Sequence, residues 1–436
     1  MIDQTKTANI WLWENLVGAV AWDADNKVAS FEFDPDFLKK GLDVAPLRMP
    51  LEVARRGSTI YTFSTLPKDT YYGLPGMLAD ALPDKFGNDL IDRWLAAQGR
   101  SPENFNPVER LCYTGKRGMG ALEFTPVFHK ELEKSVPVEV EELVRLAQEA
   151  VDDRAGLQVR FDDEPTEALL NILRVGTSAG GNRPKAIIAW NQSLNKVRSG
   201  QIEAPPGYGY WILKFDGVKD KSLGDPAGYG RIEYAYYLMA KDAGIAMNEC
   251  HLLEEKGRAH FMTRRFDRTP DGEKIHQQSL CAIAHFDYNS AGSYSYEQAF
   301  QVNRELRLPY EDMEQLYRRM VFNVAARNQD DHTKNIAYLM NQKGEWRLSP
   351  AYDVIYAFNP SGRWTKDHQM TVNGKRSGFL KTDLIYIGKE MGIRQQNRII
   401  NEVIATVVNW RKYADIAGVD QNQAVEIQKT FRLFKE

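Results

Sequence analysis

The chain has 436 residues, of which 43% are hydrophobic and 26% are charged, and its formal net charge is −3. This length predicts two or three domains, and the charge excludes a global attraction to nucleic acid or to an anionic membrane surface. The three cysteines, Cys112, Cys250 and Cys281, form no CxxC pair, which argues against a disulfide framework or a zinc site. Because no apolar stretch has the length of a membrane span and the N-terminus has no signal-peptide pattern, we expect a soluble, cytoplasmic protein.

The N-terminal third predicts strands with one clear helix. The stretches "IWLWENLVGAVAWD", "VASFEFD" and "GMGALEFTP" have the composition of strands. Between them, "LIDRWLAAQGR" predicts a helix, with Leu90, Ile91, Trp94 and Leu95 at helical spacing and Gly99 as its stop. An acidic region over residues 131–167 follows, and "VEELVRLAQEAVD" within it predicts an amphipathic connector helix with a solvated charged face.

The remainder of the chain changes from strands to helices. "AIIAW", "YGYWILKF" and "RAHFMTRRF" predict strands, and "YGRIEYAYYLMAKDAGI" predicts a helix between the last two. Beyond about residue 295 most segments predict helices, with a small hairpin over residues 336–349. A β-rich half followed by a helical half favours an α+β fold with two lobes.

Two features of this second part carry cationic groups suited to phosphates. The loop "GTSAGGNRPK" combines three glycines with two hydroxyl side chains and ends on Lys185, so its backbone N–H groups can converge on an anion. It is not a Walker A loop, and an ordinary turn is the alternative. Lys214 projects from one face of the strand "YGYWILKF", as a nucleotide kinase requires, although such a lysine can also extend to solvent.

The stretch "RNQDDHTKNI" suggests a catalytic turn. Asp330 precedes Asn335 by five positions, which is the aspartate-to-asparagine interval of the protein-kinase catalytic loop. Asp353 follows the expected hairpin, where the metal-binding aspartate of a kinase would lie, and oxygen ligands suit magnesium. A polar turn with unrelated acids is the alternative. The order of parts favours a kinase: glycine loop, strand lysine, helix with Glu233, aspartate, asparagine, hairpin and second aspartate.

These motifs resemble those of the HipA family of serine/threonine kinases, the toxins of bacterial type II toxin–antitoxin pairs. The resemblance rests on "GTSAGGNRPKA", "FMTRRFDR", "NQDDHTKN" and "LSPAYD", and less strongly on "VGAVAWDADNKVASFEFDPDFLKKG" and "GLPGMLADALPDKFGNDLI". It implies a two-lobed protein-kinase-like fold, related to the phosphatidylinositol kinases. The expected parts are an N-terminal β-rich subdomain at 1–130, an N-lobe-like region with the connector helix at 131–265, and a helical C-lobe at 266–436.

The resemblance also implies roles for individual residues, with ATP and Mg²⁺ as cofactors. Asp330 would be the general base, Asn335 and Asp353 would hold magnesium, and Ser178 (or its neighbour Thr177) would be autophosphorylated, which switches the kinase off. Asp331 has no assigned role. The implied ATP-binding residues are Gly180, Gly181, Asn182, Arg183, Pro184, Lys185, Lys214, Arg264, Arg265, Phe266, His332, Thr333, Lys334, Asn335, Tyr352 and Asp353.

The implied partners are a small helix-turn-helix antitoxin of the HipB kind, operator DNA reached mainly through that antitoxin, and a protein substrate, in some members an aminoacyl-tRNA synthetase. No membrane partner is expected. Phosphorylation of the substrate would inhibit translation and growth. The arginines Arg264, Arg265 and Arg268 fit a solvated face, a substrate-docking patch or a DNA-phosphate patch, and a structural role beside the hinge is favoured. Two other functions stay open: a catalytically weak co-repressor within an antitoxin–DNA complex, and a small-molecule kinase of related fold.

Overall fold

The structure is a computed structural model that describes residues 5–57, 59–97, 99–101, 105–128, 132–152, 167–176, 184–218 and 228–434. The chain divides into two compact units, each of which is described by itself. Unit 1 takes in residues 1–227, 253–277 and 340–344, and unit 2 takes in residues 228–252, 278–339 and 345–436. The expected division at residues 130 and 265 stays a prediction.

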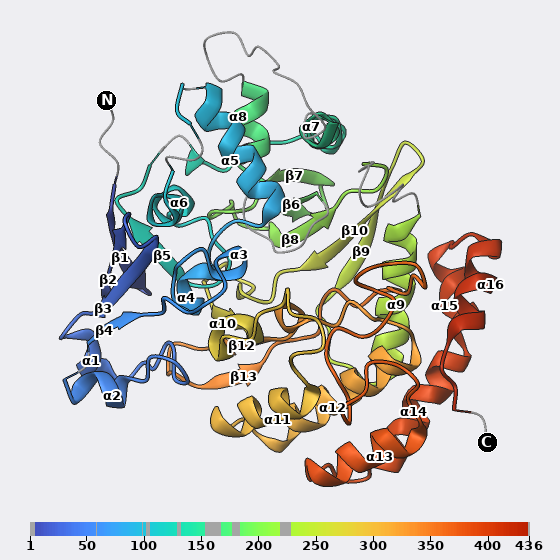
Figure 1. The fold of residues 1–436 in the computed structure, drawn as a ribbon. Helices are drawn as coiled ribbons and strands as arrows, with labels where there is room; N and C mark the ends of the chain where they lie inside the picture. Colours follow the sequence, from blue (N-terminus) through green and yellow to red (C-terminus); the bar gives the residue numbers. More distant parts are fainter. Residues whose placement is uncertain are drawn as a thin grey trace. The chain divides into compact units, whose positions relative to one another are not determined.

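Unit 1 begins with an antiparallel five-stranded sheet in the order β4-β3-β2-β1-β5 (Figure 1). Side chains alternate along β1, where Ala8, Ile10 and Leu12 are buried, because successive residues of a strand face opposite sides of the sheet. The strands are β1 (Thr7–Leu12), β2 (Asn15–Asp23), β3 (Val28–Phe33), β4 (Ile60–Thr62) and β5 (Leu122–Thr125).

The stretch "IWLWENLVGAVAWD" is therefore two strands. Leu12 pairs with Asn15, and the two residues between them, Trp13 and Glu14, have φ of 46° and 65°. Two successive left-handed residues make the hairpin turn whose twist matches antiparallel strands. Asn15 supports the turn, because its side-chain amide donates to the carbonyl oxygens of Leu12 and Trp13 at 3.0 and 2.9 Å.

A second five-stranded sheet, in the order β7-β6-β8-β10-β9, carries the expected strand lysine. Its strands are β6 (Lys185–Asn191), β7 (Lys196–Ser199), β8 (Gly209–Lys214), β9 (Cys250–Glu255) and β10 (Arg258–Arg264), so the predictions for "AIIAW", "YGYWILKF" and "RAHFMTRRF" are confirmed. The eight helices among the described residues before residue 177 are α1 (Phe37–Lys40), α2 (Leu51–Arg55), α3 (Lys68–Tyr71), α4 (Gly76–Ala79), α5 (Lys85–Ala97), α6 (Pro107–Thr114), α7 (Val140–Asp152) and α8 (Glu167–Leu173).

Helices α5, α7 and α8 and this second sheet share one apolar core. The predicted face of α5 is buried, and Trp94 packs at 5.5 Å from the ring of Tyr113. From α7 the core takes Leu143 and Ala147, as the amphipathic pattern of the connector predicted, while the strands supply Ile188 on β6 and Leu213 on β8. Burial of these side chains fixes the face of β8 from which Lys214 can project.

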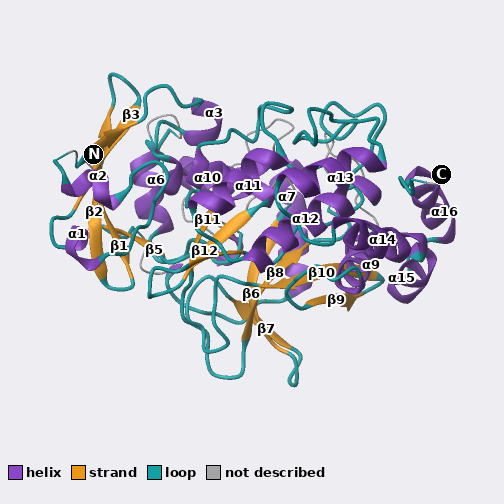
Figure 2. Cartoon of the chain, turned by 90° about the horizontal axis from the view of Figure 1, so that it is seen from below, coloured by secondary structure: helices purple, strands orange, loops and turns teal. Residues whose placement is uncertain are grey.

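Unit 2 is mainly helical (Figure 2). Its helices are α9 (Tyr229–Asp242), α10 (Leu280–Ala284), α11 (Tyr296–Glu305), α12 (Tyr310–Ala325), α13 (Lys381–Glu390), α14 (Gln396–Val408), α15 (Trp410–Ala417) and α16 (Gln421–Thr430). The predicted hairpin is present as β12 (Ala337–Met340) and β13 (Trp346–Leu348), which form a small sheet with β11 (His276–Ser279). Within the described ranges, no helix has both the length and the apolar character needed to cross a membrane.

Trp410 lies at the centre of the C-terminal helices of unit 2. It is fully buried, its ring lies 5.3 Å from that of Tyr236 on α9, and its indole N–H donates to the carbonyl oxygen of Ala424 at 3.0 Å. Phe431, the first residue after α16, also packs against Trp410, with 5.9 Å between the ring centroids. This packing directs the end of the chain back toward α12.

Candidate active site

The strand lysine lies in unit 1 beside a second lysine. Lys214 ends β8, where it pairs with Lys185 on β6 and with Phe261 on β10. Lys185 is 6% exposed, and the ammonium of Lys214 lies 5.6 Å from the ring centroid of Phe261. Two cations on adjacent strands concentrate positive charge where the glycine loop joins β6. The loop residues Thr177, Ser178, Gly180, Gly181, Asn182 and Arg183 lie outside the described residues.

The arginine cluster is a buried ion-pair network inside unit 1. Arg265 is 2% exposed, and its guanidinium binds both carboxylate oxygens of Asp267 at 2.8 and 2.7 Å. Arg268 donates to the same carboxylate at 2.7 Å. Burial alone would raise the pKa of Asp267, but the two guanidinium groups outweigh it and hold that pKa well below its ordinary value.

This network decides between the readings of the cluster. Since Arg265 and Arg268 are buried and paired, they form neither a solvated face nor a docking or DNA-phosphate patch, and the structural reading holds for both. The side chain of Arg265 is therefore excluded as a nucleotide contact. Arg264 and Phe266, also expected near the adenine, are half-buried at the end of β10 and beyond it.

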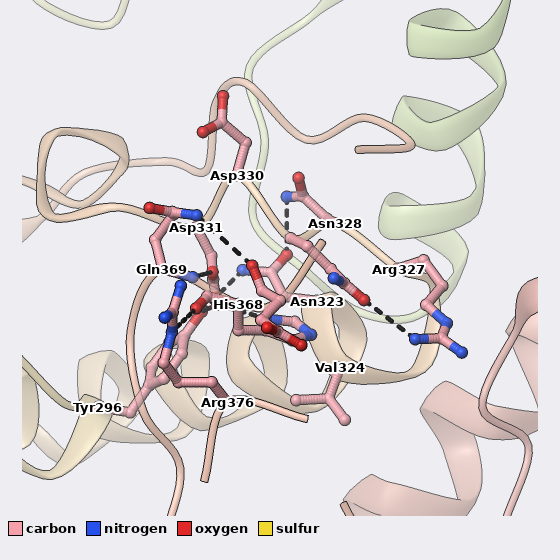
Figure 3. Close-up of polar contacts among 12 residues, drawn as sticks. Tyr296, Asn323, Val324, Arg327, Asn328, Asp330, Asp331, His368, Gln369 and Arg376 are labelled. Atoms are coloured by element: carbon pink, nitrogen blue, oxygen red, sulfur yellow. Dashed lines mark hydrogen bonds and ion pairs between the residues drawn. The ribbon is translucent and has the colours of Figure 1, made fainter. Parts of the chain in front are cut away.

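In unit 2, the turn after α12 brings Asp330 and Asn335 together. The side-chain amide of Asn335 donates to the backbone oxygen of Asp330 at 2.8 Å, across the five-residue interval found in the sequence. Its carbonyl oxygen is thereby directed away from that bond. The Asp330 carboxylate is 48% exposed, and it points away from the polar group formed by Asp331, His368 and Tyr296 (Figure 3). His332 approaches it, with 3.9 Å between Nε2 and Oδ1. Asp330 is thus held by its backbone and leaves its carboxylate accessible.

The second metal-binding candidate is tied to the same turn. The hydroxyl of Tyr352 donates to the backbone oxygen of Lys334 at 2.5 Å, so the residues that precede Asp353 and Asn335 are in contact. Asp353 has φ of 52°, a left-handed conformation that aspartate tolerates and that clusters at functional sites. Among the described residues there is no group of three or more His, Cys, Asp or Glu side chains able to hold a metal. One amide and one carboxylate oxygen fit Mg²⁺, which takes few protein ligands.

Two of the expected nucleotide contacts support this turn. The hydroxyl of Thr333 donates to the backbone oxygen of Phe286 at 2.6 Å and is buried, so it anchors the turn. The ammonium of Lys334 lies 4.7 Å from the ring centroid of Tyr288, where a cation gains from the aromatic face. Glu233, expected on the kinase helix, is buried on α9 in unit 2.

A small cavity of about 20 Å³ lies beneath the turn. This volume suits one water. Its lining includes Arg319, Asn328 and His332, and four polar atoms of these residues (Nε and Nη1 of Arg319, Oδ1 of Asn328, Nδ1 of His332) make no hydrogen bond to the described residues. Buried polar atoms of this kind are ordinarily satisfied by ordered water.

Asp331, which had no role from the sequence, is the best-connected acid of the loop. It is 3% exposed, and it accepts hydrogen bonds from the hydroxyl of Tyr296 at 2.9 Å, from His368 Nδ1 at 2.8 Å and from the backbone N–H of Gln369 at 2.8 Å (Figure 3). Burial would raise the pKa of Asp331, but His368 and these hydrogen bonds hold it below the ordinary value. Since its partners come from distant segments, spacing in the sequence gives no signal for them.

Comparisons with known proteins agree with the motifs. The family model described as HipA-like C-terminal domain matches residues 177–411, and the one described as HipA N-terminal domain matches residues 8–125. The chain is 26% identical over 276 residues to the curated "Putative kinase Y4mE" of Sinorhizobium fredii (strain NBRC 101917 / NGR234). That match covers 59% of this chain and 59% of the relative, so it spans less than two thirds of the relative's length.

A solved structure covers nearly the whole chain. It is described as "Shewanella oneidensis MR-1 Toxin Antitoxin System HipA, HipB and its operator DNA complex", with a TM-score of 0.68 and 16% identity over 98% of this chain and 96% of that chain. The likeness confirms the predicted α+β, two-lobed, kinase-like fold class. Because the C-terminal-domain model alone matches more than half of the sequence, the chain belongs to the HipA family.

Proposed function

We propose that this chain is an ATP- and Mg²⁺-dependent protein serine/threonine kinase that acts as the toxin of a HipA/HipB-type pair. The observation that carries the proposal is the turn in unit 2, where Asn335 binds the backbone of Asp330 and Tyr352 ties Asp353 to the same turn. These two bonds support the proposal because they connect the segments of the proposed base and of the two proposed magnesium ligands, and phosphoryl transfer depends on such positioning.

In this proposal each residue has a limited task. Asp330 accepts the proton of a serine or threonine hydroxyl as that oxygen bonds to the γ-phosphorus of ATP and ADP leaves. Asn335 and Asp353 would hold Mg²⁺, which neutralises charge on the phosphates when it is bound. Lys214 and Lys185, with the loop over residues 180–184, would contact the phosphates. Catalysis then consists mainly of positioning and electrostatic stabilisation of the transferred group.

Membership of the family supports a proposal for the biological role. We propose that the kinase phosphorylates a cellular protein, with an aminoacyl-tRNA synthetase as the first candidate, and so inhibits translation and growth. Autophosphorylation at Ser178 would place about −1.5 to −2 of charge in the phosphate-binding loop and so disfavour its closed form. The partners would be a small helix-turn-helix antitoxin and, through it, operator DNA, since the solved Shewanella complex contains HipA, HipB and operator DNA.

The test is phosphate transfer from labelled ATP by the purified protein with Mg²⁺. Incorporation into the protein itself or into an added synthetase supports the kinase, provided that Asp330→Asn abolishes it and Asp25→Asn, an exposed acid of unit 1, does not. Transfer only to small molecules would overturn the protein-kinase assignment. No transfer, together with tight binding to antitoxin and DNA, would favour a co-repressor.

A further inference from the structure

The end of the chain lies against the catalytic turn of unit 2. After α16, the backbone N–H of Arg432 donates to the carbonyl oxygen of Ala325, at the end of α12, at 2.9 Å. The guanidinium of Arg432 then makes three polar contacts: it donates to the carbonyl oxygen of Val324 at 3.2 Å and to Gln329 Oε1 at 3.0 Å, and it meets His368 Nε2 at 3.0 Å. It also lies 5.1 Å from the ring centroid of Phe379. One arginine thus joins the C-terminal segment to α12, to the turn and to His368.

The tautomer of His368 follows from these contacts. A guanidinium can only donate, so the contact with Arg432 requires Nε2 of His368 to accept. The proton of the neutral imidazole is then on Nδ1, which donates to Asp331 Oδ2 at 2.8 Å. Both side chains are buried, with His368 at 0% and Asp331 at 3% exposed, so water does not compete for these bonds. Arg432, His368 and Asp331 form one directed chain of hydrogen bonds.

This series of hydrogen bonds holds both sequence neighbours of Asp330. On one side is Gln329, whose side-chain oxygen accepts from Arg432 and whose amide donates to the backbone oxygens of Thr365 and Lys366 at 3.1 and 2.8 Å. On the other side is Asp331, which Arg432 reaches through His368. With the residues before and after it fixed, the backbone of Asp330 has little freedom, and its carboxylate points away from the group (Figure 3). Within the part of the chain that the structure describes, the hydrogen bonds of Arg432 and His368 involve neither Asn335 nor Asp353 nor Lys214.

We propose that Arg432 and His368 are positioning residues for phosphoryl transfer: through Gln329 and Asp331 they set the orientation of Asp330, so that docking of the C-terminal segment is a condition of full activity. The proposal rests on the proposed kinase function. Loss of this support lowers kcat by about 10- to 100-fold, as expected when an outer-shell residue or about 1 Å of placement is lost. The KM for ATP changes less than about twofold, because the nucleotide and metal ligands are untouched.

The test compares Arg432→Gln with Lys429→Gln. The second substitution also removes a cation from this part of the chain, but that cation is exposed and pairs with Glu426. Kinetics of labelled phosphate transfer give kcat and KM, thermal unfolding reports stability, and nucleotide titration reports ATP affinity. We expect a selective fall in kcat for Arg432→Gln and wild-type kinetics for Lys429→Gln. Arg432→Lys retains charge without the planar fork and should recover kcat only in part. A folded Arg432→Gln with wild-type kcat, or a loss that appears only as a higher KM, would overturn the proposal.

Two substitutions of His368 distinguish its hydrogen bond to Asp331 from its hydrogen bond to Arg432. Asn places an amide N–H near the position of Nδ1 and retains the bond to Asp331, whereas Gln reaches the position of Nε2 and loses it. We expect His368→Asn to retain a higher kcat than His368→Gln. The reverse order would contradict the direction of the hydrogen bonds from Arg432 through His368 to Asp331. If the wild type transfers no phosphate, the proposed function fails and the positioning role with it. If the wild type is active and the Arg432 and His368 variants have the same kcat, the proposed function stands and only this inference is refuted.

Discussion

The Nδ1–H of His368 donates to the carboxylate of Asp331 at 2.8 Å, which joins two fully buried side chains 37 positions apart in the chain. The bond gives the two adjacent aspartates of the turn opposite tasks. Asp331 faces inward and holds the turn, while Asp330 faces outward and remains accessible. Under the proposed function, chemistry and stability are therefore assigned to neighbouring residues.

Substitution of each aspartate by alanine should separate these tasks. Asp331→Ala leaves three buried donors, on Tyr296, His368 and Gln369, without their acceptor, and we expect it to lower the free energy of unfolding by about 3–5 kcal/mol. Asp330→Ala removes a half-exposed acid and should cost less than about 1 kcal/mol. Urea denaturation of the two variants measures the difference. Equal losses would mean that the outward and inward assignments are wrong.

Changes at Asn335 should alter the magnesium requirement. Asn335→Ala removes the proposed oxygen ligand and the bond that closes the turn onto Asp330, which is worth about 1 kcal/mol. We expect a higher Mg²⁺ concentration for half-maximal transfer, whereas Asn335→Asp retains an oxygen ligand and should lie between the wild type and the alanine variant. A magnesium titration of the rate is the measurement, and an unchanged midpoint in Asn335→Ala would exclude this residue as a ligand.

Arg265 should matter for stability and not for nucleotide binding. Arg265→Ala leaves the buried Asp267 with one cation in place of two, and we expect a loss of about 3–5 kcal/mol in the free energy of unfolding. Protein that remains folded at low temperature should bind ATP with wild-type affinity, measured by titration calorimetry. If affinity fell while stability held, Arg265 would have to be restored to the nucleotide site.

The stability of unit 1 should depend on pH through His276. Burial lowers the pKa of this fully buried imidazole from 6.5 to about 4. Between these values the unfolded chain binds more protons than the folded one. The stability contributed by the buried, neutral His276 is therefore complete above about pH 6.5 and is lost as the pH falls toward about 4. The difference between the two pKa values corresponds to a loss of about 3 kcal/mol in the free energy of unfolding, at about 1.4 kcal/mol per pKa unit.

His276→Gln removes this titration, and its difference in unfolding free energy from the wild type should shrink or reverse as the pH is lowered from 7 to about 4. Denaturation at several pH values measures that difference directly, because the other titrating groups are common to both proteins. A difference independent of pH would contradict the lowered pKa.

What the sequence predicts well is local. The interval from Asp330 to Asn335 and the hairpin that delivers Asp353 depend on a few consecutive residues, and the alternation along β8 already placed Lys214. The features that the sequence left undetermined depend on tertiary packing or on local backbone conformation. Trp13 and Glu14 form a left-handed turn without the glycine or asparagine that usually marks one. For Arg265 the sequence favoured a structural role but left a solvated face, a docking patch and a DNA-phosphate patch open, because its burial depends on packing within unit 1.

The role of Asp331 was beyond prediction for the same reason. Its side-chain partners, Tyr296 and His368, lie 35 and 37 positions away, and Arg432 lies 64 positions beyond His368. No periodicity or short motif joins such distances. Only the folded arrangement of α11, the segment before α13 and the segment after α16 brings Tyr296 and His368 to this carboxylate and Arg432 to His368.

The central claim is that Asp330 is the catalytic base and that Asp331 only supports it. The most direct measurement is the rate of labelled phosphate transfer by folded wild type, Asp330→Asn and Asp331→Asn under the same Mg²⁺ and ATP. We expect a loss of about 10²- to 10⁴-fold for Asp330→Asn, as for removal of a general base, and a smaller loss of about 10-fold for Asp331→Asn. Wild-type activity in Asp330→Asn, or a greater loss in a folded Asp331→Asn, would contradict the account.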